Sequence, residues 1–237
     1  MLELSGVNSG YGSHQVLFDI SMSAKKNSII IIIGPNGAGK TTLFRTIMGL
    51  TNIYSGKIIF DGNDITSFST NKIVKLGISY VPQRGGFFEK LTVKENLLIG
   101  GYLLKRDERE AMMGEVFKLF PVLTRKDYIE RKASRLSGGE RRMLAIAMGL
   151  MKKPKLILLD EPTEGLMPKL MVEVYDKIKE VHEETGAQIL MTAEKAQLSL
   201  ELGDEAFLLV SGRIQDHRDA NEMLNDPELR DKYFGIY

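Results

Sequence analysis

The sequence predicts an α/β fold in which a mainly parallel core sheet is joined by an antiparallel β subdomain and a helical insert. The first observation is the run at residues 28–33, whose unbroken isoleucines are typical of a strand buried on both faces. The run stops at Gly34, and a helix is expected from about residue 40 to residue 48. Strand, glycine-rich turn and helix begin an α/β unit. The other observations are short strand-like segments around this unit and apolar residues at helical spacing after it.

The remaining elements follow from their local patterns. Three further segments are typical of buried strands: residues 155–160, 188–192 and 206–210. Short antiparallel strands with turn signals are expected at residues 2–7, 16–21 and 57–60. Helical spacing marks residues 95–104, 109–120 and 140–151, within an insert of about residues 86–151. Because no linker separates two units, we expect a single domain over residues 1–237.

The composition excludes several functional classes. The chain has 237 residues and a formal net charge of +1, which does not indicate a basic surface for nucleic acid. It has no cysteine, so disulfides, thiol catalysis and cysteine-bound metals are excluded. No apolar run approaches the ~20 residues that are needed to cross a bilayer. Any role at a membrane therefore requires a partner that spans it, and no nucleic acid is expected as a partner.

Residues 34–41, here called the phosphate loop, read GPNGAGKT and fit the pattern G-x-x-x-x-G-K-[ST]. Glycines let successive backbone N–H groups point at phosphate oxygens, and the following helix directs its positive end at the same anion. Lys40 would reach the β- and γ-phosphates, and the Thr41 hydroxyl would bind Mg²⁺. A flexible glycine turn is the alternative, which the flanking strand and helix disfavour. The predicted nucleotide contacts are Asn36, Gly37, Ala38, Gly39, Lys40, Thr41 and Thr42.

Two adjacent carboxylates, Asp160 and Glu161, end the second buried strand. Open α/β sheets bind their ligands at the carboxyl ends of strands. Asp160 is expected to hold Mg²⁺, directly or through water, and Glu161 to orient or deprotonate the attacking water. A pair of solvated carboxylates is the alternative, and the phosphate loop makes that alternative less favoured.

A second glycine-rich segment, LSGGE at residues 136–140, is here called the signature loop. It precedes a predicted helix that Ser137 can cap, and its two glycines leave backbone amides uncovered. The chemistry indicates a second anion site about 100 residues after the first. An ordinary capping box with loop glycines is the alternative.

The phosphate loop, the signature loop and the strand ending LLDEP occur in the order and at the spacing of ABC ATPases. This resemblance covers essentially the whole chain, and it implies a phosphate-loop NTPase fold of the ABC type with ATP and Mg²⁺ as cofactors. In that family two copies meet head to tail, and each ATP lies between one copy's phosphate loop and the other's signature loop. Ser137, Gly138, Gly139 and Glu140 would provide the signature contacts.

The same resemblance implies the partners and the location of the protein. The partners would be a second ABC ATPase subunit, in a homo- or heterodimer, and transmembrane permease subunits. The location would be cytoplasmic, peripheral on the inner face of the cell membrane.

Matching to the family adds two site residues. Tyr11, in NSGYG, resembles the aromatic residue that stacks on adenine, and a packed tyrosine at a strand end is the alternative. Gln83, in YVPQ, resembles the glutamine that contacts Mg²⁺ and the attacking water, and a plain turn residue is the alternative. Asn36 and Ser137 either add polar contacts to phosphate or face solvent.

The family pattern is broken at the end of the third buried strand, where Glu194 stands in place of the usual histidine that senses the γ-phosphate. An ionised carboxylate beside a triphosphate is repulsive by ~1 kcal/mol or more. Glu194 would therefore stay protonated, point away, or pair with Lys195 or another cation. We expect hydrolysis to be retained through Glu161 but to be slower than in relatives with histidine.

Three local features resemble the smaller ATPase of branched-chain amino-acid importers: GGFF leading into LTVKENL at residues 85–97, GLMP at residues 165–168 and PELRDKYFG at residues 227–235. The lipopolysaccharide-exporting ATPase shares parts of all three. Branched-chain amino-acid import is therefore favoured, and the alternatives are an ABC exporter or a regulatory ABC ATPase with weak hydrolysis. A DNA-maintenance ATPase would need long coiled-coil insertions, and a ribosome-associated factor would normally have a second phosphate loop. The sequence has neither heptads nor a second phosphate loop, so both classes are disfavoured.

Two aromatic groups carry structural expectations. Phe87 and Phe88 follow Gln83, where such subunits receive a helix from the membrane partner, and internal packing is the alternative. Leu229, Tyr233 and Phe234 are expected on one face of a short terminal helix that packs on the sheet.

Replacing Glu194 with histidine is expected to raise the ATPase rate, because the resemblance implies that a histidine at this position senses the γ-phosphate. The measurement is phosphate release at saturating MgATP, with Glu184→His as the control. An unchanged or lower rate in the Glu194 variant would contradict the expectation.

Overall fold

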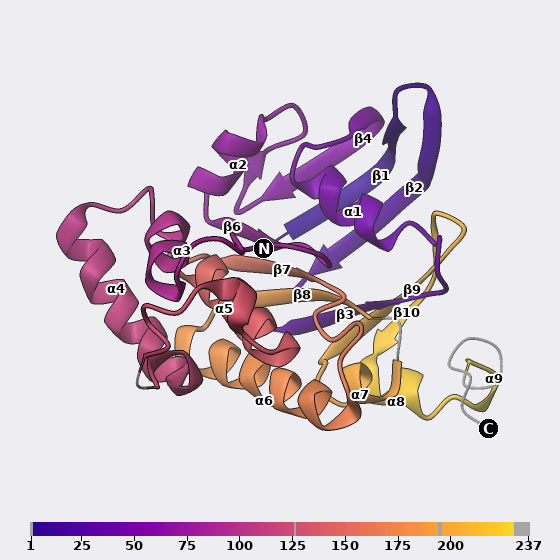
Figure 1. Cartoon of the computed structure of the whole chain (residues 1–237). Helices are drawn as coiled ribbons and strands as arrows, with labels where there is room; N and C mark the ends of the chain where they lie inside the picture. Colours follow the sequence, from indigo (N-terminus) through magenta and orange to yellow (C-terminus); the bar gives the residue numbers. More distant parts are fainter. Residues whose placement is uncertain (1, 126, 194–195, 230–237) are drawn as a thin grey trace.

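The core of the molecule is a mostly parallel sheet, and a second, antiparallel sheet lies beside it (Figure 1). The computed structural model describes residues 2–125, 127–193 and 196–229. The core sheet has the order β10-β9-β3-β8-β7-β6. Its strands are β3 (Ile29–Ile33), β6 (Ile78–Val81), β7 (Leu156–Asp160), β8 (Gln188–Ala193), β9 (Glu205–Val210) and β10 (Arg213–Asp219). Only the β9–β10 pairing is antiparallel among these, which confirms the predicted mainly parallel core.

The antiparallel sheet has the order β2-β1-β4-β5. Its strands are β1 (Leu2–Tyr11), β2 (His14–Ala24), β4 (Asn52–Phe60) and β5 (Asn63–Asp64). The predicted strands lie within these bounds, but the real strands are longer. Register shifts beyond Leu4 let the β1–β2 pairing continue to the turn, where Tyr11 pairs with His14. Pattern alone does not reveal such irregular pairing, because a bulge interrupts the alternation of side chains.

Helices cover both sheets and form the insert at one end (Figure 1). The α-helices are α1 (Lys40–Ile47), α2 (Thr70–Lys75), α3 (Val93–Gly100), α4 (Arg106–Leu119), α5 (Gly138–Leu150), α6 (Pro168–Thr185), α7 (Ala196–Leu200), α8 (Ala220–Leu224) and α9 (Pro227–Leu229). Two 3-10 helices, η1 (Pro121–Thr124) and η2 (Ala133–Arg135), lie between α4 and α5. The three predicted insert helices correspond to α3, α4 and α5, and Pro121 begins η1 two residues after α4 ends.

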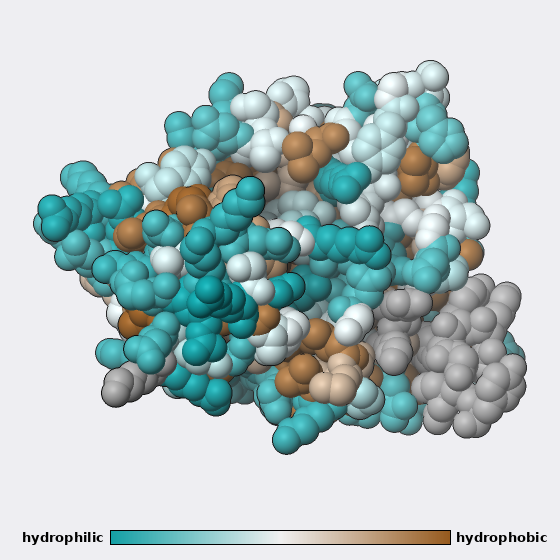
Figure 2. Space-filling view, in the orientation of Figure 1, coloured by the Kyte–Doolittle hydropathy of each residue, from teal (hydrophilic) through white to brown (hydrophobic). Residues whose placement is uncertain are grey.

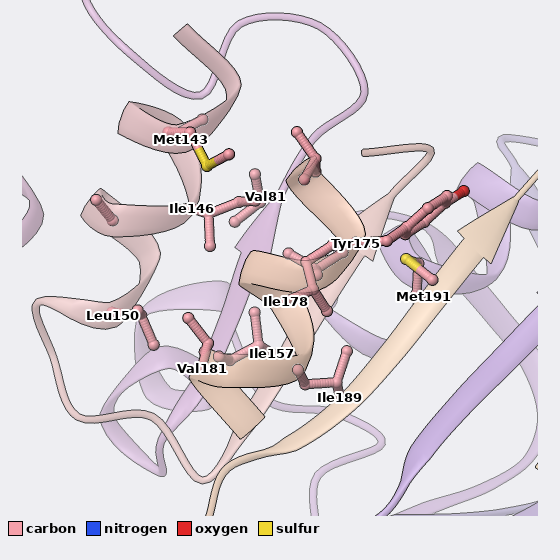
Figure 3. Close-up of a cluster of buried hydrophobic side chains, with 14 of the residues drawn as sticks. Val81, Met143, Ile146, Leu150, Ile157, Tyr175, Ile178, Val181, Ile189 and Met191 are labelled. Atoms are coloured by element: carbon pink, nitrogen blue, oxygen red, sulfur yellow. The ribbon is translucent and has the colours of Figure 1, made fainter. Parts of the chain in front are cut away.

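Strand β3 is buried on both faces because it lies between two hydrophobic clusters. Ile29, Ile31 and Ile33 belong to a cluster shared with α5 and α6, whereas Ile30 and Ile32 belong to one shared with α1 and the antiparallel sheet. Figure 3 shows the α6 side of the first cluster, where Tyr175, Ile178 and Val181 lie over Ile157, Ile189 and Met191 of the sheet. The alternation explains why all five β3 residues are apolar.

The turn between β9 and β10 ties the two sheets together at the phosphate loop. The Gly212 N–H donates to the carbonyl oxygen of Ala38 at 2.9 Å, and its carbonyl oxygen accepts from the Phe18 N–H at 2.8 Å. Gly212 has φ 73°, and a Cβ there would lie 1.9 Å from the Val16 carbonyl oxygen. Only glycine fits this position, so the turn clamps the phosphate loop to β2.

Two elements beside the site, β6 and α6, are not among those predicted from the sequence. The four residues of β6 are too few for a periodic pattern. Helix α6 does have clear boundary signals, since Pro168 is its first residue and Gly186 ends it with φ 65°. Its buried residues recur at helical spacing: Met171, Val174, Tyr175, Ile178 and Val181. All of them except Met171 belong to the hydrophobic cluster on the core sheet.

The aromatic expectations have mixed outcomes. Phe87 is partly buried against the core cluster, whereas the Phe88 side chain is exposed, so the two phenylalanines do not share one environment. Leu229 packs against the same cluster from α9, and Tyr233 and Phe234 lie outside the described residues. In the part of the chain that the structure describes, no helix has the length and hydropathy required to cross a bilayer.

Replacing Gly212 with alanine is expected to lower the free energy of unfolding by about 3 kcal/mol, because left-handed strain of ~1–2 kcal/mol is joined by a backbone clash. Gly62 is a matched control, since it has φ 79° and open space around its missing Cβ. Gly62→Ala should therefore lower the free energy of unfolding only by the strain of about 1–2 kcal/mol. Urea denaturation followed by circular dichroism measures both variants. Equal losses of stability would contradict the close backbone contact at Gly212.

Candidate functional site

The phosphate loop is shaped by close backbone contacts between β3 and α1. A Cβ at Gly34 would lie 2.0 Å from the carbonyl oxygen of Leu209 in β9, so the loop leaves the sheet against neighbouring backbone. Helix α1 then begins at Lys40. The loop and α1 border a cavity of about 240 Å³. Its lining residues are Val16, Asn36, Gly37, Ala38, Gly39, Lys40, Thr41, Thr42, Gln83 and Glu161.

Three predicted site residues, Lys40, Gln83 and Glu161, meet in this cavity through Glu161. The Lys40 ammonium donates to the Gly34 carbonyl oxygen at 2.8 Å and forms an ion pair with Glu161 at 3.2 Å. The other Glu161 oxygen accepts from the Gln83 amide at 2.7 Å. The side chains of Lys40 and Glu161 are only 5% and 8% exposed, so each compensates the buried charge of the other.

Glu161 is held in an unusual backbone conformation. Its φ is 44°, in the left-handed region that residues with a Cβ rarely adopt. Its N–H donates to the Thr192 hydroxyl at 2.9 Å, which fixes the turn after β7. Such strain is typical of functional positions, because the surrounding structure must maintain it.

Asp160 is held by hydroxyl groups from three elements. Thr41 of α1 and Thr192 of β8 donate to its Oδ1 at 3.2 and 2.8 Å. Tyr80 of β6 donates to its Oδ2 at 3.0 Å. Parallel pairing explains the convergence, since Asp160 lies in register with Thr192.

The oxygen donors fit a magnesium ion bound together with phosphate. Thr41 and Asp160 offer a hydroxyl and a carboxylate within 3.2 Å of each other, beside the phosphate loop. The described residues include no cluster of three or more His, Cys, Asp or Glu that would cage a metal by themselves. Mg²⁺ is usually held by one or two carboxylates, substrate phosphates and water, which matches this donor set.

Tyr11 lies at the end of β1, next to α1. Its hydroxyl accepts from the Arg45 guanidinium at 3.3 Å and is 3.5 Å from the Thr42 hydroxyl. The residue is 40% exposed, and stacking on adenine and packing at the strand end both stay predictions. This position is compatible with the predicted stacking on adenine.

The signature loop forms a complete capping box at the start of α5. The Glu140 N–H donates to the Ser137 hydroxyl at 3.3 Å, and the Ser137 N–H donates to the Glu140 carboxylate at 2.8 Å. Tyr128 also donates to Glu140, at 3.0 Å. Burial opposes the charge on Glu140, but these donors outweigh it and lower its pKa. The capping role is therefore present, and it leaves the second anion site as a prediction.

The phosphate loop and the signature loop border different cavities. Ser137, Gly139 and Glu140 line a cavity of about 450 Å³ between the insert and α6. Among the residues that the structure describes, this cavity shares no lining residue with the one at the phosphate loop. The two loops therefore do not enclose a single nucleotide within one chain.

Several residues beside the site were not predicted from the sequence: Tyr80, Arg142 and Thr192. Arg142 of α5 donates to the carbonyl oxygens of Pro82 and Gln83 at 3.2 and 2.8 Å, and burial lowers its pKa. Arg142 thereby connects α5, the helix that begins at the signature loop, to the backbone of Gln83. A sequence pattern could have identified Thr192, since it is a hydroxyl residue that ends a predicted buried strand. No such pattern marks Tyr80 or Arg142, because their partners are distant in sequence.

The predicted site residue Glu194 lies outside the residues that the structure describes.

A phosphate loop, strand-end carboxylates and a parallel core sheet define a phosphate-loop nucleotide-binding protein. A family model described as ABC transporter matches residues 17–164, which is more than half of the chain. The chain belongs to the ABC transporter family, as an ATP-binding protein of the ABC ATPase type.

Curated relatives cover the whole length. The chain is 40% identical over 236 residues to the probable branched-chain amino acid transport ATP-binding protein LivF of Archaeoglobus fulgidus, covering 100% of this chain and 99% of the relative. It is 39% identical to the high-affinity branched-chain amino acid transport ATP-binding protein BraG of Pseudomonas aeruginosa, covering 99% and 100%. The lipopolysaccharide export system ATP-binding protein LptB of Escherichia coli is 32% identical, with 95% and 93% covered.

Solved structures share the fold. An ATP-binding cassette of an ABC transporter in its ADP conformation superposes with a TM-score of 0.86 at 28% identity. The superposition covers 100% of this chain and 99% of that one.

Ser137→Ala is expected to lower the free energy of unfolding by about 1 kcal/mol, because the α5 cap is lost. Thr92→Ala is a matched control, since Thr92 forms an equivalent capping box with Glu95 at the start of α3. Both variants should lose similar stability, measured by urea denaturation. Only Ser137→Ala should also lower the ATPase rate at low MgATP, roughly tenfold, if Ser137 binds phosphate. Equal rates in the two variants would contradict the signature contact.

Proposed function

We propose that this protein is the ATP-hydrolysing subunit of an ABC transporter that imports branched-chain amino acids. The observation that most supports hydrolysis is the joint placement of Lys40, Glu161 and Gln83 in the cavity of the phosphate loop, beside Asp160. This arrangement supplies a cation, a carboxylate and an amide around the position of a terminal phosphate.

Each residue has a distinct chemical role in the proposal. The N–H groups of the phosphate loop bind the phosphates, and Lys40 exchanges the Gly34 carbonyl oxygen or Glu161 for a β- or γ-phosphate oxygen. Glu161 orients the attacking water and accepts its proton, while Gln83 positions Glu161 and that water. Thr41 and Asp160 would hold Mg²⁺, which neutralises charge that develops on the phosphates. Tyr11 would stack on the adenine ring.

Complete sites require two chains in this proposal. The separate cavities of the phosphate loop and the signature loop suit a head-to-tail dimer, in which each ATP contacts one loop from each copy. Ser137, Gly138, Gly139 and Glu140 would then contact the partner's nucleotide at the positive end of α5. The second subunit is the same chain or a different ABC ATPase.

The cargo follows from the relatives. The relatives named for branched-chain amino-acid transport are 40% and 39% identical over the full length, against 32% for LptB. This difference favours import of branched-chain amino acids over export of lipopolysaccharide. The subunit would lie on the inner face of the cell membrane, bound to permease subunits.

An exposed apolar surface suits the permease contact. Phe88, Ile99, Tyr102 and Leu103 are exposed on and beside α3, and Figure 2 shows hydrophobic residues gathered over this part of the insert. Gln83 lies just before this segment, so a permease helix seated here would be linked to the nucleotide site. We assign Phe88, rather than the partly buried Phe87, to this contact.

Replacing Glu161 with glutamine is expected to reduce ATP hydrolysis by about a hundredfold or more, because the carboxylate that accepts the proton is lost. Nucleotide binding should be retained, and MgATP should convert the variant to a dimer in gel filtration. Glu183→Gln on the exposed face of α6 is the control and should hydrolyse ATP at the normal rate.

Two results would contradict the proposed function. Absence of hydrolysis in the unchanged protein would leave a regulatory nucleotide-binding role. Full hydrolysis in Glu161→Gln would remove Glu161 from the mechanism. A Glu161→Gln variant that stays monomeric with MgATP alone, but dimerises with a second ABC ATPase, would identify a heterodimer.

A further inference from the structure

The two carboxylate oxygens of Asp160 are held from opposite sides. Thr41 and Thr192 donate to Oδ1, and Tyr80 donates to Oδ2 at 3.0 Å. Asp160 is 1% exposed, so its rotation is set by these hydroxyl groups rather than by water. Among the described residues, Tyr80 is the hydrogen-bond donor on the Oδ2 side.

Tyr80 is itself rigidly placed. It pairs in register with Leu158 of β7, and its ring meets the Phe44 ring of α1 edge to face, with centroids 6.3 Å apart. From this fixed position, the Tyr80 hydroxyl donates to Asp160 Oδ2.

We propose that Tyr80 is a positioning residue that orients Asp160 for the divalent cation accompanying ATP. The inference rests on the proposed function, because it assigns the metal to Asp160. A tyrosine that only packs against Phe44 would fill the same space but would not influence the metal. The hydroxyl group therefore distinguishes the two roles.

The test is Tyr80→Phe, which removes the hydroxyl and retains the ring contact with Phe44. Protein loaded with one equivalent of a non-hydrolysable ATP analogue is titrated with Mn²⁺, and free Mn²⁺ is counted by electron paramagnetic resonance. The affinity for the same analogue is measured separately in EDTA. We expect the variant to bind Mn²⁺ roughly tenfold more weakly, because the metal-binding carboxylate of Asp160 loses a hydrogen-bond donor. The affinity for the analogue in EDTA should be unchanged.

Tyr175→Phe is the matched control. Tyr175 is also buried, and its hydroxyl is hydrogen-bonded to the Thr163 hydroxyl at 2.9 Å. This variant loses one buried hydrogen bond without changing a donor to Asp160, so its Mn²⁺ affinity should equal that of the unchanged protein. Equal Mn²⁺ affinity in Tyr80→Phe and Tyr175→Phe would overturn the inference.

These outcomes separate the inference from the proposed function. If the unchanged protein fails to bind the ATP analogue, the proposed function is wrong. If it binds the analogue and Mn²⁺ normally and Tyr80→Phe does the same, only the role of Tyr80 is wrong.

Discussion

The parallel pairing of β3 with β8 and of β8 with β7 is the constraint on which the site depends. It brings the end of β3, Thr192 and Asp160 to one edge of the sheet, although they are far apart in the chain. The phosphate loop leaves β3 at that edge against the Leu209 carbonyl, and the Gly212 N–H donates to the Ala38 carbonyl oxygen of the same loop. A shift of one residue in this register would separate Asp160 from Thr41 and Thr192.

Buried charge at this edge is compensated in two different ways. Lys40 and Glu161 compensate each other as a buried ion pair, which stabilises little but determines which groups face the cavity. Asp160 is instead stabilised by hydroxyl donors. This difference suits their proposed roles, because the Lys40 ammonium can move to a phosphate while Asp160 keeps a defined orientation toward a cation.

The helical insert is connected to the same edge by polar contacts with backbone. Arg142 of α5 donates to the carbonyls of Pro82 and Gln83, and Gln83 in turn donates to Glu161. Helix α5 and the proposed catalytic carboxylate, Glu161, are therefore linked through the short segment at residues 82–83. Phe88, exposed five residues after Gln83, places the apolar surface of the insert on that segment as well.

The sequence by itself determined the parallel core, the phosphate loop and the strand-end carboxylates. These features depend on local spacing: an isoleucine run, a glycine pattern and a pair of acids after an apolar strand. It did not reveal β6, Tyr80 or Arg142, because their partners lie far away in the chain and no local pattern marks them. Only the tertiary structure decided that Phe87 and Phe88 have different environments, and that the phosphate loop and the signature loop border separate cavities. Both depend on how the insert packs against the sheet, which residue spacing does not encode.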